Sequence, residues 1–159
     1  MARAGFVAGL MVVIALVALD IKADVGYHIQ LARSGGVIRH SDAVYRLASY
    51  LDQQGGEPLA LDWGIRTSIE LLTQGRISPA EVFFYQKDTP PPWVDWIYGY
   101  MTREPERLYV FHADDMTVFP RRADFLALAE KIGKKAVLDQ TVNQRDGRPV
   151  YLVYKVQDP

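Results

Sequence analysis

Polar side chains close two strand-like runs of the chain, at the positions where an α/β sheet would hold a ligand. Asp62 and Trp63 follow the apolar run 58–61, and His112 ends the strand-like run 107–112. The carboxyl ends of parallel strands meet at one edge of a sheet, and ligands of open α/β sheets gather beyond that edge. If the two strands are neighbours, we expect Asp62, His112 and Asp114 to converge, and we predict that Asp62, Trp63 and His112 contact a ligand.

Two further acids, Asp114 and Asp115, follow His112 and suggest metal chemistry. Imidazole nitrogens and carboxylate oxygens are metal ligands, so one hypothesis is a small metal-dependent hydrolase that uses these acids together with Asp62 and His112. The H-x-D-D spacing is not a specific metal motif, however, and Asp62 is equally suited to capping the helix that follows it. We favour this structural interpretation. Because no motif of a phosphate-binding loop or of an activated serine is present, we predict no metal, no cofactor and no catalytic residue.

The second group of candidate residues is aromatic. Trp93, Trp96 and Tyr100 stand at i, i+3 and i+7, a spacing that places three large rings on one face of a helix. We predict that Trp93 and Trp96 are platforms for a sugar ring. Packing in the core and a position at a membrane–water interface are the alternatives that the same spacing allows.

Periodicity and turn residues predict the elements that position these side chains. The predicted helices are 41–54, 65–74, 93–101 and 120–132, and the predicted strands are 59–62, 107–112, 135–143 and 148–156. Residues 81–86 form either a strand or a buried connection. Alternation of strand and helix predicts parallel pairing of the first two strands, and Asp146-Gly147 signals the turn of a terminal hairpin. The predicted fold is a small α/β sandwich of two or three layers, with a mixed sheet that ends in a β-hairpin.

The N-terminal stretch 4–19 organises the rest of the chain. It holds sixteen residues without charge, proline or amide, between Arg3 and Asp20. As a helix it spans about 24 Å, less than the roughly 30 Å hydrocarbon core, and snorkelling by Arg3 and Lys22 covers the remainder. A helix that is apolar on every face must be buried on every face, so we predict a transmembrane helix.

The predicted organisation is a single transmembrane helix over 1–22, a juxtamembrane connector over 23–40 and one domain over 41–159. A cleaved signal peptide and a buried core helix are the alternatives. Lys22 makes a poor signal-peptide cleavage site, and the apolar segment is longer than is usual for a core helix. Arg3 before the helix places the N-terminus in the cytoplasm. We therefore expect a single-pass protein of the cell membrane, with its domain in the periplasm or the extracellular space.

Charge and composition exclude several classes of function. The net charge is -1 and the sequence has no basic run, so nucleic acid has no electrostatic support as a partner. Cysteine is absent, which excludes disulfides, thiolate metal sites and cysteine nucleophiles. The lipid bilayer is the predicted partner of the N-terminal helix.

Several segments of the chain are similar to a known family. They are SDAVYRLASYL at 41–51, PLALDWGIRTSIELLTQG at 58–75, LYVFH at 108–112, FPRRADF at 119–125 and GRPVYLVYKV at 147–156. Together they resemble the C-terminal extracytoplasmic region of bacterial GT-C glycosyltransferases, which include dolichyl-phosphate-mannose and protein O-mannosyltransferase-like enzymes and the lipid A arabinose transferases. In that family many membrane helices precede a soluble α/β domain, and 4–19 corresponds to the last of them.

The resemblance implies a domain of, or accessory to, a glycosyltransferase that uses a polyprenyl-phosphate sugar. The catalytic acids of the family lie in a loop between membrane helices for which this sequence has no counterpart. The implied role is therefore non-catalytic, on the acceptor side of the enzyme or in stabilising its membrane part. The implied partners are that membrane part and a carbohydrate or lipid-linked sugar. The alternative is a membrane-anchored protein-interaction module with no link to sugars.

Overall fold

The computed structural model describes residues 2–37, 39–104 and 106–158. In chain order the elements are α1 (Ala2–Ser34), β1 (Gly36–Val37), β2 (His40–Ser41), α2 (Ala43–Gln54), β3 (Leu59–Ala60), α3 (Arg66–Leu72), β4 (Ala80–Glu81), α4 (Pro91–Arg103), β5 (Tyr109–His112), α5 (Arg122–Lys131), β6 (Lys135–Asn143) and β7 (Pro149–Gln157). The helices and strands predicted from the sequence lie at these positions, with ends that differ by about two residues. Of the segment 81–86, only Glu81 belongs to a strand.

Five strands form one mixed sheet in the order β4-β3-β5-β7-β6. β3 is parallel to both β4 and β5, while β7 is antiparallel to β5 and β6. The predicted fold class is thereby confirmed. β3 is short, but the Leu61 amide still donates to the carbonyl of Val110 at 2.9 Å, so pairing with β5 extends to the residue before Asp62.

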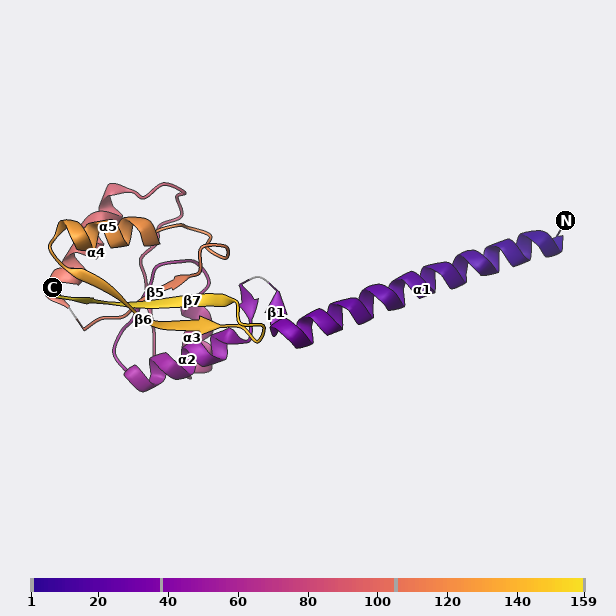
Figure 1. Cartoon of the computed structure of the whole chain (residues 1–159), viewed down its shortest axis with the longest axis horizontal. Coiled ribbons are helices and arrows are strands. Elements are labelled where there is room, and N and C mark those ends of the chain that lie inside the picture. Colours follow the sequence, from indigo (N-terminus) through magenta and orange to yellow (C-terminus); the bar gives the residue numbers. More distant parts are fainter. Residues whose placement is uncertain (1, 38, 105, 159) are drawn as a thin grey trace.

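The sheet buries both faces, because side chains alternate along each strand. Ala60, Val110 and Val153 pack with α2 and α3 in one apolar cluster. Leu59, Tyr109 and Leu152, each one residue away from these, pack with α4 and α5 in a second cluster. The domain is therefore a three-layer sandwich, with α2 and α3 below the sheet and α4 and α5 above it in Figure 1.

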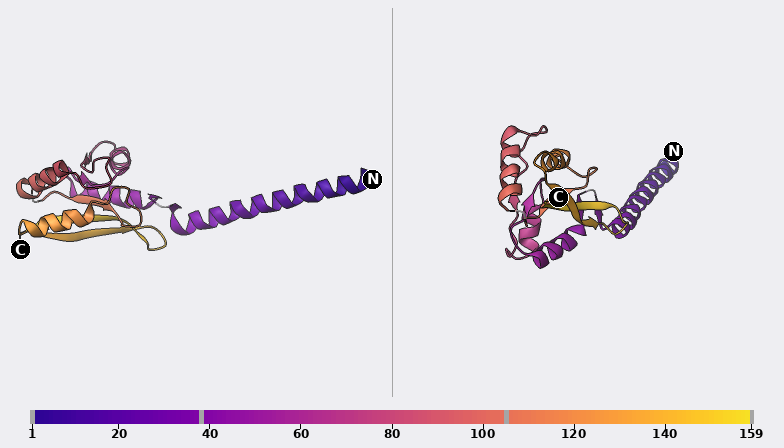
Figure 2. Two further views of the ribbon diagram at one scale, coloured as in Figure 1. Left: turned by 90° about the horizontal axis from the view of Figure 1, so that it is seen from above. Right: turned by 60° about the vertical axis from the view of Figure 1, so that its left-hand side comes forward.

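α1 projects from one end of this sandwich as an isolated rod (Figures 1 and 2). It is long and apolar enough to cross a membrane, and no side chain of its most apolar part is buried against the rest of the protein. The same helix continues through residues 20–34, past the apolar stretch, by about 22 Å at 1.5 Å per residue. This second part of α1 forms a stalk between the apolar stretch and the domain.

The stalk is tied to the domain by the turn between β6 and β7. The Arg145 amide donates to the carbonyl of Ser34 at 3.3 Å, and its Nη1 donates to the carbonyl of Ala32 at 3.3 Å. Arg145 Nε also binds the carboxylate of Asp42 at 2.6 Å, and the Asp42 amide donates to the carbonyl of Gly35 at 2.9 Å. These bonds place the β6–β7 turn against the end of α1.

The carboxyl ends of the parallel strands point toward the same end of the domain. β5 runs antiparallel to β7, and His112, the last residue of β5, pairs with Tyr151 near the beginning of β7. Because the turn before β7 contacts α1, the edge that carries His112 faces the stalk.

Candidate ligand-binding cleft

Asp62 follows β3 and is a buried carboxylate, with 1% of its surface exposed. Three backbone amides donate to it: Trp63 at 2.8 Å and Phe119 at 3.0 Å to Oδ1, and Val118 at 3.0 Å to Oδ2. The two later amides belong to the loop between β5 and α5, which folds back over the end of β3. Asp62 therefore receives the backbone of two loops at once.

Two side chains complete the shell of Asp62. Thr117 Oγ1 donates to Oδ2 at 2.7 Å, and His112 Nδ1 lies 3.0 Å from the same oxygen. Burial alone would raise the pKa of Asp62, but hydrogen bonds from His112, Thr117 and the Phe119 amide outweigh it and hold the pKa below its usual range. Asp62 is thus ionised at neutral pH and acts only as an acceptor.

This acceptor determines the tautomer of His112. Because an ionised carboxylate has no proton to donate, the proton of the Asp62–His112 hydrogen bond is assigned to Nδ1. In the neutral ring Nε2 then carries a lone pair, and it has no hydrogen-bond partner among the residues that the structure describes. His112 is 3% exposed, and its ring lies against that of Tyr151, with centroids 5.0 Å apart.

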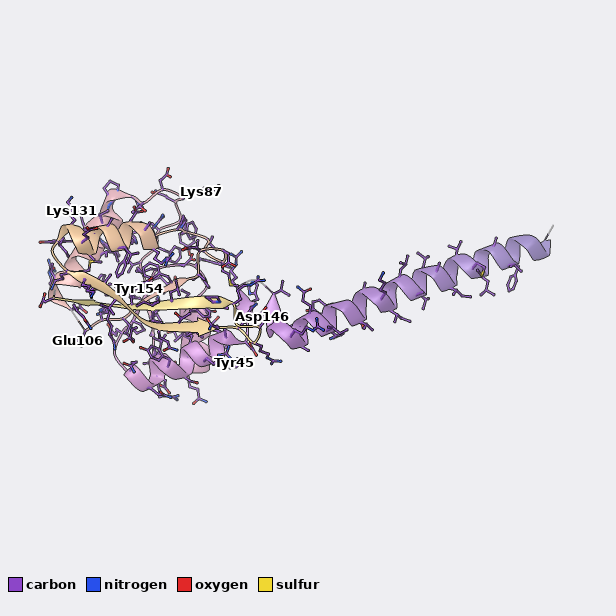
Figure 3. All side chains as sticks on the ribbon, viewed as in Figure 1. Tyr45, Lys87, Glu106, Lys131, Asp146 and Tyr154 are labelled. Carbon is purple, nitrogen blue, oxygen red and sulfur yellow. The ribbon has the colours of Figure 1, made fainter. Side chains whose placement is uncertain are left out.

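His112 and Tyr151 line an open cleft of about 660 Å³ at the edge of the sheet that faces the stalk. Its walls come from the segment between α1 and α2, from the beginning of α3 and from the ends of β4 and β5. Three rings on its rim are open to solvent: Tyr45 is 61% exposed, Trp63 43% and Tyr85 75%. In Figure 3, Tyr45 lies at the end of the domain nearest α1.

A buried arginine holds the loop that carries Tyr85. Arg121 is 1% exposed, and its guanidinium donates to the carbonyls of Phe83 at 2.9 Å and Lys87 at 2.8 Å and to that of Gln86. Burial lowers the pKa of Arg121, but an arginine remains charged at neutral pH. The rim of the cleft is therefore fixed from the inside of the domain.

The two predicted sugar platforms lie away from this cleft. Trp93 is completely buried, and its Nε1 donates to the carbonyl of Val82 at 2.8 Å. It exposes no ring face, so its predicted contact with a sugar is wrong and core packing is its role. Trp96 is 54% exposed and lies edge-to-face with Phe84, at 5.6 Å between centroids, beside a separate hollow along α4.

The structure brings Asp62 and His112 together, with Trp63 beside them, but the expected convergence of Asp114 with this pair is wrong, and Asp115 also lies outside. Asp114 binds Arg122, with Nε 3.0 Å from Oδ1, and Asp115 is exposed. Within the described ranges, no three histidine, aspartate or glutamate side chains lie close enough to hold a metal ion. The four ligands of the metal-hydrolase hypothesis are therefore not assembled.

Sequence reasoning missed the donors of loop 117–119, the ring of Tyr151 and the buried Arg121. Backbone amides leave no residue signature, and Tyr151 is remote in sequence from Asp62 and His112. Comparison of the chain with models of protein families, with curated proteins and with solved structures gave no match.

Proposed function

We propose that this protein is a membrane-anchored, extracytoplasmic domain of, or accessory to, a glycosyltransferase that uses a polyprenyl-phosphate sugar. In this proposal α1 crosses the cell membrane and the domain lies in the periplasm or the extracellular space. The domain is not catalytic; it shapes the acceptor side or stabilises the membrane part of the enzyme. The observation that carries the proposal is the position of the cleft on the edge of the sheet that faces α1.

The orientation of the cleft suits a ligand or partner held at the membrane. A membrane-bound acceptor approaches the domain from the side of the stalk, and the cleft with its exposed rings lies on that side. The resemblance of segments 41–51, 58–75 and 147–156 to the tails of GT-C enzymes supplies the class of partner.

The polar centre of the site is suited to holding groups in place. Five donors occupy the Asp62 carboxylate, so it orients His112 and the loop 117–119 rather than reacting with a ligand. A buried carboxylate whose oxygens are all hydrogen-bonded holds the surrounding side chains and loops rigidly in place. This favours a binding role over a chemical step of its own.

Topology can be tested because the chain contains no cysteine. A single cysteine at Lys131, which is exposed on α5, should react with a membrane-impermeant maleimide in intact cells. The matched variant Ala2→Cys should react only after lysis. Labelling of the two positions in the opposite order would overturn the orientation.

The partner is tested by photo-crosslinking in native membranes. A photoreactive residue at Tyr45, beside the cleft, should capture a membrane protein with many transmembrane helices and glycosyltransferase activity. The same residue at Lys131, at the opposite end of the domain in Figure 3, should not capture it. Capture only of soluble proteins, or equal capture from both positions, would overturn the proposal in favour of the protein-interaction module.

A further inference from the structure

We infer that the cleft binds a neutral sugar ring, with one face of the ring on Trp63 and a hydroxyl group donating to His112 Nε2. The inference deepens the proposed function, because the membrane-bound ligand would be recognised through its sugar and not through its phosphate.

The rim offers rings to water and not to lipid. Trp63 and Tyr85 are exposed beside a polar floor, as in sites where an apolar ring face meets a hydroxyl-rich ligand. A membrane-interface belt is the competing role of such rings. Beyond the transmembrane segment 1–22, however, the remaining part of α1 up to Ser34 rises about 18 Å, which exceeds the roughly 5–8 Å of headgroup region on each side of a bilayer. Even with a tilt of about 40°, it still rises about 14 Å.

The floor of the cleft is suited to a ligand group that donates a hydrogen bond. In its neutral form with the proton on Nδ1, His112 presents a lone pair at Nε2, which accepts a hydrogen bond from a hydroxyl group but repels an ionised phosphate oxygen. Tyr151, which is 3% exposed, also lines the cleft, and its hydroxyl has no hydrogen bond to another described residue. A hydroxyl both donates and accepts, so a sugar can satisfy both groups.

The charge of the walls points the same way. The ionised side chains that line the cleft are Arg39, Asp42 and Glu81; because Arg145 neutralises Asp42, one guanidinium and one carboxylate remain and their charges balance. Asp42 is bound by Arg145, and Arg39 Nη1 lies 3.5 Å from the carbonyl of Met116. An anionic ligand gains little here, whereas carboxylates accept hydrogen bonds from sugar hydroxyls. The volume of about 660 Å³ falls within the range of small-molecule sites, about 300–1,000 Å³.

Binding is measured on the full-length chain in detergent micelles by saturation-transfer NMR. The probes are the methyl pyranosides of mannose, glucose and galactose, with inorganic phosphate as the anionic probe. We expect at least one pyranoside to bind, and phosphate not to bind. Phosphate binding without pyranoside binding would overturn the inference in favour of an anion site. Quenching of tryptophan fluorescence by brominated lipid in vesicles that hold the full-length chain, if it disappears in Trp63→Ala, would overturn the inference and assign the rim to the membrane.

One matched pair of variants and a third substitution locate the site. Trp63→Ala should weaken pyranoside binding at least tenfold, while Trp96→Ala, which removes a ring of somewhat greater exposure outside the cleft, should leave it unchanged. His112→Asn can still donate to Asp62 but lacks the acceptor at the Nε2 position, so it should weaken binding about tenfold while near-ultraviolet circular dichroism shows the domain folded. Equal binding in Trp63→Ala and the parent protein would overturn the inference.

The two proposals can fail separately. Pyranoside binding without crosslinks from Tyr45 to a membrane protein would leave the sugar site standing and remove the glycosyltransferase partner. Crosslinks without binding of any pyranoside would retain the partner and remove the sugar site.

Discussion

The two ends of the sheet are built from different interactions. At the end that faces α1, Asp62 and His112 are almost completely buried, and every hydrogen bond of the carboxylate comes from protein groups. At the opposite end, marked by Glu106 and Lys131 in Figure 3, charges pair at the surface, and Arg107 binds Glu104 and Glu57. Both ends share the same apolar layers, so the layers alone do not require a buried charge. The end that buries charge is therefore the end where binding is expected.

The largest effect should follow from Asp62→Asn. The substitution removes a buried negative charge and turns an amide group toward Thr117 and the loop amides, so donors face donors. Each buried donor that is left without an acceptor costs about 1–3 kcal/mol, so the substitution should lower the free energy of unfolding by about 3–5 kcal/mol. Urea denaturation of the full-length chain in micelles, followed by near-ultraviolet circular dichroism, measures it. Asp115 is exposed on the same loop, so Asp115→Asn should change this free energy by less than about 0.5 kcal/mol. If both variants lost the same free energy of unfolding, the proposed difference between buried and surface charge would be wrong.

Tyr151 provides a second test of the α1-facing end, in alkali. Burial raises the pKa of Tyr151 to about 12, from an ordinary value of about 10. The folded protein thus binds this proton more tightly than the unfolded chain, so the stabilisation is present below about pH 10 and is lost as the pH rises toward 12. Relative to Tyr151→Phe, the parent protein should lose about 2–3 kcal/mol of unfolding free energy over this interval. Parallel curves for the two proteins from pH 9 to 12 would refute the buried hydroxyl.

Substitution of one glycine at each end of the sheet should have a smaller effect, and it tests how tightly each end is packed. Gly35 at the stalk and Gly56 at the opposite end both have left-handed backbone, with φ of 76° and 78°. A Cβ at Gly35 would collide with the Asp42 carboxylate, which Arg145 holds, whereas a Cβ at Gly56 would meet nothing. We expect Gly56→Ala to cost about 1 kcal/mol from backbone strain alone, and Gly35→Ala about 2 kcal/mol. Thermal melting of the two variants side by side measures the difference, and a larger loss in Gly56→Ala would contradict it.

The parts of this site that follow from the periodicity of strands and helices could be predicted from the sequence. Asp62 and His112 converge as predicted, because parallel strands end at the same edge of a sheet. The helical spacing of Trp93 and Trp96 was also right, but spacing does not reveal which face is buried. Trp93, Ile97 and Met101, at i, i+4 and i+8, form the core stripe, and Trp96 falls beside it.

Other parts of the site were beyond sequence reasoning because they depend on loop closure. The Val118 and Phe119 amides that bind Asp62 would be offered by any non-proline residues at these positions. Tyr151 reaches His112 only through the antiparallel register of β5 and β7, and that register is fixed by packing across the whole sheet. Arg121 donates its hydrogen bonds to backbone carbonyls and not to carboxylates, so the sequence contains no charge pattern from which its burial could be predicted.

The smallest effect is expected at the end opposite α1. Glu104, just after the end of α4, binds Arg107 three residues further along the chain, but its side chain is 43% exposed, and surface ion pairs of this kind contribute at most about 1 kcal/mol. Glu104→Gln should therefore lower the free energy of unfolding by less than about 1 kcal/mol, and 1 M salt should abolish the difference because the Debye length falls to about 3 Å. Salt should leave the loss in Asp62→Asn nearly unchanged, since water and ions do not reach that carboxylate. The comparison would fail if the Glu104→Gln loss persisted in salt or approached that of Asp62→Asn. Both ends of the sheet would then depend on a charge that is shielded from solvent, and burial of charge would no longer distinguish the cleft from the opposite end of the described domain.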